Sequence, residues 1–165
     1  MEFLFQLVPR ENQISSLQLL FSTAEHGYSL TTLYNSAGKC TTRKGMIFCI
    51  KTSIGDVFGG YCGELFKITQ IYYIGSEESF VFSLLPKREV FKSAGVNTYY
   101  LRCDTNSFSF GGSSEGEGKG EAIRIEQDFA TGTTYSSETF NNKPLTGEAK
   151  ENMFKCAEFE VYALK

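Results

Sequence analysis

The residues that first suggest chemistry lie in a glycine-rich segment at positions 113–121, which reads SSEGEGKGE. Successive backbone N–H groups without side chains can surround a phosphate group. A Walker loop follows the pattern G-x-x-x-x-G-K-[ST], but here Ser113 takes the place of the first glycine and Gly120 that of the magnesium-binding hydroxyl. The three glutamates of the segment would also repel phosphate. The segment therefore predicts a mobile connection between two strands, and no cofactor is expected.

Histidine and cysteine side chains are further candidates for metal binding or catalysis. His26 is the single histidine, and it is either a general base or a hydrogen-bonded histidine in a corner between two helices. The cysteines form no C-x-x-C pair, so a zinc site is not expected. Cys40, beside Lys39 and Arg43, has the electropositive neighbours that a reactive thiol needs, with an ordinary loop cysteine as the alternative. The five cysteines are Cys40, Cys49, Cys62, Cys103 and Cys156.

Acidic side chains offer one more route to catalysis. Glu78, Asp104 and Asp128 could supply the paired carboxylates of a small hydrolase, with solvated loop acids as the alternative. No nucleophile motif accompanies them. We therefore expect no catalytic centre and no metal site, and we keep a thiol-based antioxidant enzyme or a small hydrolase as the alternative function.

Composition and charge set the class of protein that must position these residues. A chain of 165 residues suits one domain over positions 1–165, and its 15 Phe, 9 Tyr and 16 Gly favour sheets with an aromatic core. The net charge of −3 and the lack of a basic run argue against a nucleic-acid partner. The first eight residues are too short for a signal sequence, and no apolar run is long enough to insert into a membrane. With an odd number of cysteines, this predicts a protein of the cytoplasm, with the nucleus or an organelle surface, reached through a protein partner, as alternatives.

The first third of the chain predicts two short helices and a hairpin. Apolar residues at helical spacing predict a helix over 15–22, which breaks at His26-Gly27. Ser29 is placed to cap a second helix that stops near Gly38. Two apolar runs then predict a hairpin of strands 46–50 and 57–61, in which Gly59 and Gly60 interrupt the second strand and allow a bulge or the close approach of another segment.

The remaining sequence predicts further antiparallel strands. Residues 79–85 and 89–92 flank Pro86 as a pair. The stretch 98–145 alternates as strands on both sides of the glycine-rich segment, and 154–164 alternates with Ala157, Phe159, Val161 and Ala163 inward. The expected fold is mainly β (α+β), a sandwich of two antiparallel sheets with short helices near the N-terminus.

The order of short motifs along the chain resembles that of the TLDc domain family. The resemblance covers about residues 17–164 and rests on six pieces at matching separations. They are LFSTAEHGYSL (20–30) with the following Leu33-Tyr34, IKTSIGDVFG (50–59), ESFVF (78–82), Cys103-Asp104, SFGG (109–112) and ETFNNKPL (138–145).

The resemblance implies a two-sheet sandwich that serves as an interaction module without an agreed catalytic centre. It also implies a role in resistance to oxidative stress and binding to the soluble sector of the vacuolar proton-pumping ATPase. Exposed loops at 75–78 and 141–143 are plausible contact points. The motif positions that we expect to support partner binding are His26, Gly27, Gly59, Glu78, Asp104, Gly111, Gly112, Asp128, Phe140 and Asn142.

Two departures from the family pattern concern the partner more than the fold. The family usually has Trp-Thr-Gly where this chain has KSAG at 92–95, and Gly-Leu-Trp-Leu-Asp where it has AIRIE at 122–126. Tryptophans at these places are candidate surface anchors, because aromatic side chains often carry interface energy.

Overall fold

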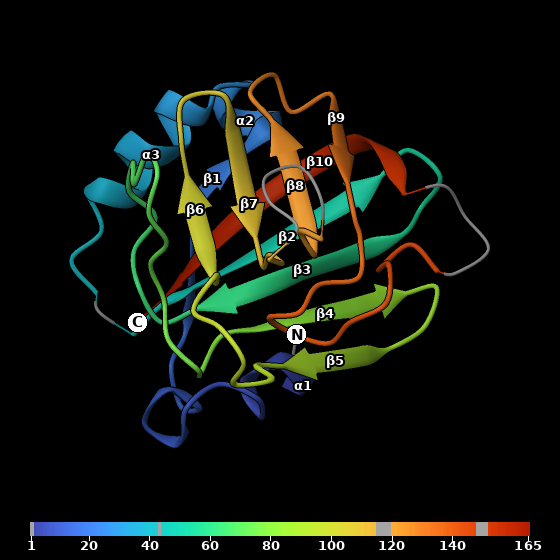
Figure 1. The fold of residues 1–165 in the computed structure, drawn as a ribbon. Helices are drawn as coiled ribbons and strands as arrows, with labels where there is room; N and C mark the ends of the chain where they lie inside the picture. Colours follow the sequence, from blue (N-terminus) through green and yellow to red (C-terminus); the bar gives the residue numbers. More distant parts are fainter. Residues whose placement is uncertain (1, 43, 115–119, 148–151) are drawn as a thin grey trace.

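The structure is a computed structural model that describes residues 2–42, 44–114, 120–147 and 152–165. In this part of the chain ten antiparallel strands form one hydrogen-bonded sheet, in the order β5-β4-β3-β2-β10-β9-β8-β7-β6, and the tenth strand, β1, lies off this path and pairs with β10 (Figure 1). None of its helices is long and apolar enough to cross a membrane. The helices are α1 (Glu2–Phe5), the 3-10 turn η1 (Arg10–Asn12), α2 (Thr23–His26) and α3 (Leu30–Gly38). The strands are β1 (Leu17–Ser22), β2 (Met46–Thr52), β3 (Val57–Cys62), β4 (Phe80–Leu85), β5 (Glu89–Lys92), β6 (Leu101–Cys103), β7 (Ser107–Phe110), β8 (Ile123–Glu126), β9 (Thr131–Thr133) and β10 (Met153–Leu164).

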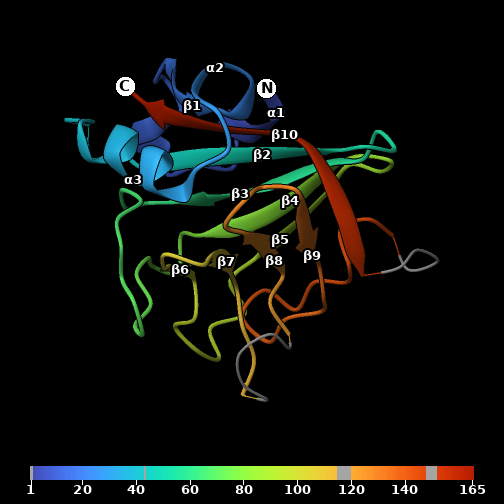
Figure 2. The same cartoon turned by 90° about the horizontal axis from the view of Figure 1, so that it is seen from above.

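Strand β10 joins the two layers of the fold. Its first residues, Met153 to Lys155, pair with β9, whereas the stretch from Cys156 onward pairs with β2. The register shifts between Cys156 and Glu158, where the strand turns from one layer into the other (Figure 2). The mainly β, antiparallel fold class is therefore confirmed, with both layers of the sandwich linked through one shared strand.

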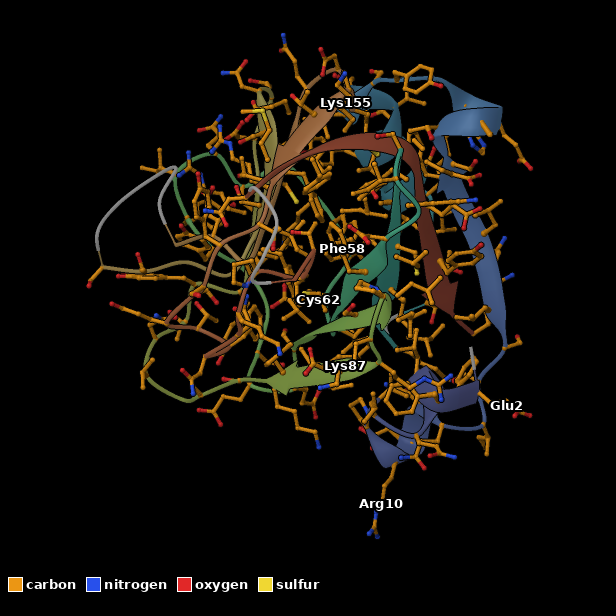
Figure 3. The ribbon with its side chains drawn as sticks, turned by 90° about the vertical axis from the view of Figure 1, so that its right-hand side faces the viewer. Glu2, Arg10, Phe58, Cys62, Lys87 and Lys155 are labelled. Carbon is orange, nitrogen blue, oxygen red and sulfur yellow. The ribbon has the colours of Figure 1, made fainter. Side chains whose placement is uncertain are left out.

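Aromatic rings fill the space between the layers. Phe48 of β2 meets Phe108 and Phe110 of β7 edge-on, with ring centroids 5.0 and 5.3 Å apart, and stacks on Phe159 of β10 at 5.9 Å. Phe58, labelled in Figure 3, is fully buried and meets Phe154 edge-on at 5.1 Å. Edge-to-face pairs of this kind add stability beyond the area that they bury.

A second apolar cluster covers the outer face of the first layer. Leu4 of α1 and Val8, both almost fully buried, pack with Ile47, Tyr61 and Phe82 of the sheet. The N-terminal residues therefore cover a face that an isolated sheet would leave open to water. Our sequence reasoning did not anticipate this layer.

The helix expected over 15–22 is wrong, because this stretch forms strand β1. Its register against β10 shifts between Leu19 and Phe21. The shift places Leu20 and Phe21 together on the inner core, whereas Leu17 packs against the outer cluster. Two consecutive apolar residues three and four positions after Leu17 imitate the spacing of a helix. The helical turn before Gly27 is α2, and the cap predicted for α3 is confirmed, since the Ser29 hydroxyl accepts a hydrogen bond from Thr32 N–H.

Two further details of the strands differ from expectation. Gly59 and Gly60 do not interrupt β3, but the expected close approach is present, because a Cβ on Gly59 would overlap the carbonyl oxygen of Phe48. Ala157 is exposed rather than inward, since the register shift beside it resets the alternation of β10. The strand pairs on both sides of Pro86 and of the 113–121 connection are confirmed. Residues 115–119, for which we predicted a mobile connection, lie outside the described part of the chain.

We predict that Gly59→Ala lowers the free energy of unfolding by about 3 kcal/mol, the upper end of the usual cost of overpacking, because the new methyl group meets backbone atoms that cannot move aside. The matched control is Gly38→Ala at the end of α3, where nothing lies within 4 Å of the added Cβ. This control should be neutral or slightly stabilising. Urea denaturation of both variants measures the difference, and equal midpoints would contradict the close-packing argument.

Candidate functional site

Four of the ten predicted positions come together in one place, where the end of β7 meets the segment 137–142. We call this place the junction, and define it as residues 96–100, 110–114 and 137–142. It contains Gly111, Gly112, Phe140 and Asn142, which lie on separate motifs in the sequence. The other six predicted positions lie outside it.

Thr139 is the fully buried centre of the junction. The N–H of Gly112 donates to Thr139 Oγ1 at 2.9 Å, and the Thr139 and Glu138 N–H groups donate to the Gly112 carbonyl at 3.3 and 3.1 Å. Thr139 Oγ1 also lies 2.9 Å from Asn97 Oδ1, which accepts the N–H of Tyr99 at 3.1 Å. One hydroxyl thus ties three distant segments together.

Ring packing holds the same segments from the inside. Phe140 stacks on Phe110 with a centroid distance of 5.3 Å and an interplanar angle of 16°, and also contacts Tyr100. Gly111 has φ of +78°, and an added Cβ would lie 3.1 Å from the Phe140 ring. A side chain at position 111 would therefore be strained by the backbone as well as by the ring.

Asn142 is a brace, not a contact residue, because its side chain is 3% exposed and fully hydrogen-bonded. Its Oδ1 accepts from the Ser137 hydroxyl at 2.6 Å, and its amide nitrogen donates to the carbonyls of Tyr135 and Lys143, both at 2.9 Å. It fixes the turn that presents the residues between 138 and 141.

The solvent side of the junction includes Asn141, from the loop 141–143 that we expected to be exposed, and also Val96, which the sequence did not single out. Val96 is 66% exposed, and Asn141 is exposed with φ of +47°. The Glu138 carboxylate accepts from the Ser114 N–H and hydroxyl at 3.1 and 2.9 Å. Val96 lies just before the stretch 98–145, which we predicted to contain strands, but nothing in the sequence indicates that its side chain is exposed.

His26 and Gly27 lie in the corner between α2 and α3. The Ser22 N–H donates to His26 Nδ1 at 3.1 Å, and the imidazole stacks on Phe21 with centroids 5.6 Å apart. Gly27 has φ of +77°, as a helix terminus of this kind requires. The arrangement matches the hydrogen-bonded corner histidine that we kept as one of two readings.

The predicted acids serve their own loops. Asp104 Oδ1 accepts the N–H groups of Asn106 and Ser107, both at 2.7 Å, and its Oδ2 pairs with Arg102 at 3.2 Å. Asp128 accepts the N–H of Ala130 at 2.9 Å. These are side-chain caps of turns.

Glu78 lies on the surface beside Gly63, where it lines a shallow hollow. In the described part of the chain, no three His, Cys, Asp or Glu side chains gather as a metal site would require. The remaining predicted position, Gly59, is a packing position within β3.

Burial keeps most of the thiols protonated. It raises the pKa of Cys49, of Cys62 and of Cys156 from 9.0 to about 12, with nearby carboxylates adding to the rise. Burial also raises the pKa of Cys103 strongly. A thiol must lose its proton to attack, so these four side chains are poor nucleophiles near neutral pH.

We predict that Thr139→Val lowers the free energy of unfolding by about 1–3 kcal/mol, because the Gly112 N–H loses its acceptor inside the protein. Thr146→Val is the matched control. Its hydroxyl is also buried but has no hydrogen-bond partner among the described residues, so its replacement by a methyl group should be neutral or stabilising. Thermal and urea unfolding of the two variants decide the matter, and equal losses would show that Thr139 does not hold the junction.

Comparisons with known proteins identify the family of this chain. The family model described as the TLDc domain matches residues 1–165. Oxidation resistance protein 1 of Homo sapiens is 36% identical over 148 residues, which is 89% of this chain. Nuclear receptor coactivator 7 of Homo sapiens is 32% identical over 162 residues, or 98% of this chain. The chain spans 16% of the length of each of these relatives. This chain belongs to the TLDc domain family.

Proposed function

We propose that this chain is a protein-interaction module that acts in resistance to oxidative stress by binding the soluble sector of the vacuolar proton-pumping ATPase. Family membership and the similarity to proteins named for oxidation resistance support the stress-related role. The choice of the ATPase follows from the resemblance of the sequence motifs to the family.

The observation that carries the proposal is the convergence of separate motifs on the junction. Thr139 and Asn142 are buried and fix backbone geometry, while Val96, Glu138 and Asn141 face solvent on the same rigid loops. Binding surfaces benefit from such loops, because a partner need not first order them. The buried motif residues build the surface, and the exposed ones contact the partner.

The module acts without chemistry of its own. Four thiols are held protonated by burial, and Asp104 and Asp128 are engaged in capping turns. His26 is hydrogen-bonded beside an aromatic ring. These observations weigh against a thiol-based antioxidant enzyme or a small hydrolase. The site of action is the cytoplasm or the cytoplasmic surface of an organelle that carries the ATPase.

We predict that the buried thiols of the native protein react with a disulfide reagent far more slowly than a free thiol at neutral pH. A pKa of about 12 in place of 9.0 lowers the thiolate fraction roughly a thousandfold. The reaction should accelerate as the pH rises toward 12, because deprotonation increases. The same reagent added in urea gives the reference rate. A thiol that reacts faster than the free one in the folded protein would favour the enzymatic alternative.

We predict that purified ATPase loses activity in proportion to bound module, with saturation near one module per pump. Val96→Asp should weaken this effect about tenfold or more, since a charge is placed in the contact surface. The matched control is Ile54→Asp on the β2–β3 hairpin, where the side chain is similarly exposed at 71%. Activity lost at strongly substoichiometric amounts would indicate catalysis. Absence of binding, or equal effects of both variants, would refute the proposed surface.

A further inference from the structure

Strand β1 is an edge of the sheet that the fold leaves unprotected. It pairs with β10 on one side, and no strand pairs with its other side in the described part of the chain. Figure 3 shows this blue strand at the rim of the molecule. An open strand edge presents unpaired N–H and C=O groups, which form a template for another strand.

The other two edges of the sheet are managed differently. Strand β5 is four residues long and carries Glu89 and Lys92 at its ends, and charges of this kind discourage pairing. Strand β6 is covered by the preceding loop, since Leu101 and Ile74 exchange both backbone hydrogen bonds at 2.8 and 3.0 Å. By contrast, β1 has the sequence LQLLFS, with neither a charge nor a proline.

The ladder with β10 decides which backbone groups of β1 face outward. Ser16 and Lys165 exchange both hydrogen bonds, at 3.1 and 2.9 Å. In an antiparallel ladder such pairs alternate with pairs that make none, so Gln18 also bonds to β10 while Leu17 and Leu19 point their N–H and C=O groups away. No partner for these outward groups is found among the described residues.

The outward groups are complementary to themselves. If a second copy approaches antiparallel with Gln18 on the two-fold axis, Leu17 of each copy lies opposite Leu19 of the other. Each of these pairs can exchange two hydrogen bonds, four in all. Four leucine side chains then meet on one face, and the two uncharged Gln18 side chains meet on the other.

We propose that the free edge of β1 pairs with β1 of a second copy of this chain, in an antiparallel register centred on Gln18. Leu17 and Leu19 are only partly buried in the single chain, and Ile14, just before the strand, is 94% exposed. These apolar groups gain burial in the pair. The bulge after Leu19 limits the paired length, so the contact is of the small, transient class, with a dissociation constant on the order of 100 µM.

This pairing is independent of the ATPase and of the junction, and it is tested with the pure chain alone. Sedimentation velocity over a concentration series up to about 1 mM should show a reversible monomer–dimer equilibrium. Gln18→Lys should weaken the dimer about tenfold or more, because two ammonium groups then lie directly opposite each other. Gln127→Lys adds the same charge at another exposed position and should leave the equilibrium unchanged.

Two further variants test the register. Leu19→Pro removes an N–H that faces outward, so it should abolish pairing while the ladder with β10 stays intact, and Leu19→Ala controls for the lost side chain. Unfolding curves verify that each variant is folded. The Gln18→Cys variant tests the same register by disulfide crosslinking between copies, so this test does not depend on a destabilising substitution. Opposed Cα atoms in a pair without hydrogen bonds are about 4.5 Å apart, close enough for a disulfide between copies.

Oxidised Gln18→Cys should therefore run as a linked dimer on a non-reducing gel, whereas Gln127→Cys should not. A chain that stays monomeric at the highest concentration would overturn the proposal. So would a dimer that is unaffected by Gln18→Lys and is not linked through Gln18→Cys, since it would use another surface.

Discussion

The structure depends on β10 being shared between two layers. A single strand of 12 residues contributes its first part to one layer and the rest to the other, and the register shift near Glu158 allows the change of direction. Because β10 links the layers through backbone hydrogen bonds, the change of direction along this strand sets how far apart the layers lie. The rings of Phe48, Phe108 and Phe159 then fill a space whose width is already set. A core rich in Phe and free of Trp is thus filled by rings in contact across the two layers.

The junction takes its rigidity from the same arrangement. Phe110 ends β7 within the inner core, and Phe140 stacks on it from the loop above. Thr139 completes the connection through the Gly112 N–H. A loop held in this way combines the accessibility of a surface with the order of a core, which is what a preorganised contact requires. Val96 can vary without disturbing the fold, since none of the bracing hydrogen bonds uses its side chain.

The sequence predicts the layers better than it predicts the places where strands depart from regularity. The hairpins, the α3 cap and the end of β7 follow from local patterns of apolar, turn and capping residues. Strand β1 was misjudged because a bulge imitates helical spacing, and a bulge depends on pairing with a strand about 140 residues away. For the site, glycines and Phe140 stood out by type, whereas Thr139 is an ordinary residue whose importance comes from the three segments that surround it.

The two departures from the family pattern now have structural positions, and they bear on the choice of partner. The segment 92–95 borders the junction, since the Ser93 hydroxyl lies 2.9 Å from the Tyr100 hydroxyl and the Ala94 N–H donates to the Thr139 carbonyl. The second tryptophan position corresponds to Arg124, which is paired with Glu126 at 2.8 Å on the face of β8. Small or charged side chains thus stand at the two places where the resemblance implies a tryptophan. We therefore expect partner specificity in this chain to depend on other side chains around these positions, such as the partly exposed Tyr73 and Tyr99 rings, which lie 5.0 Å apart beside Gly112.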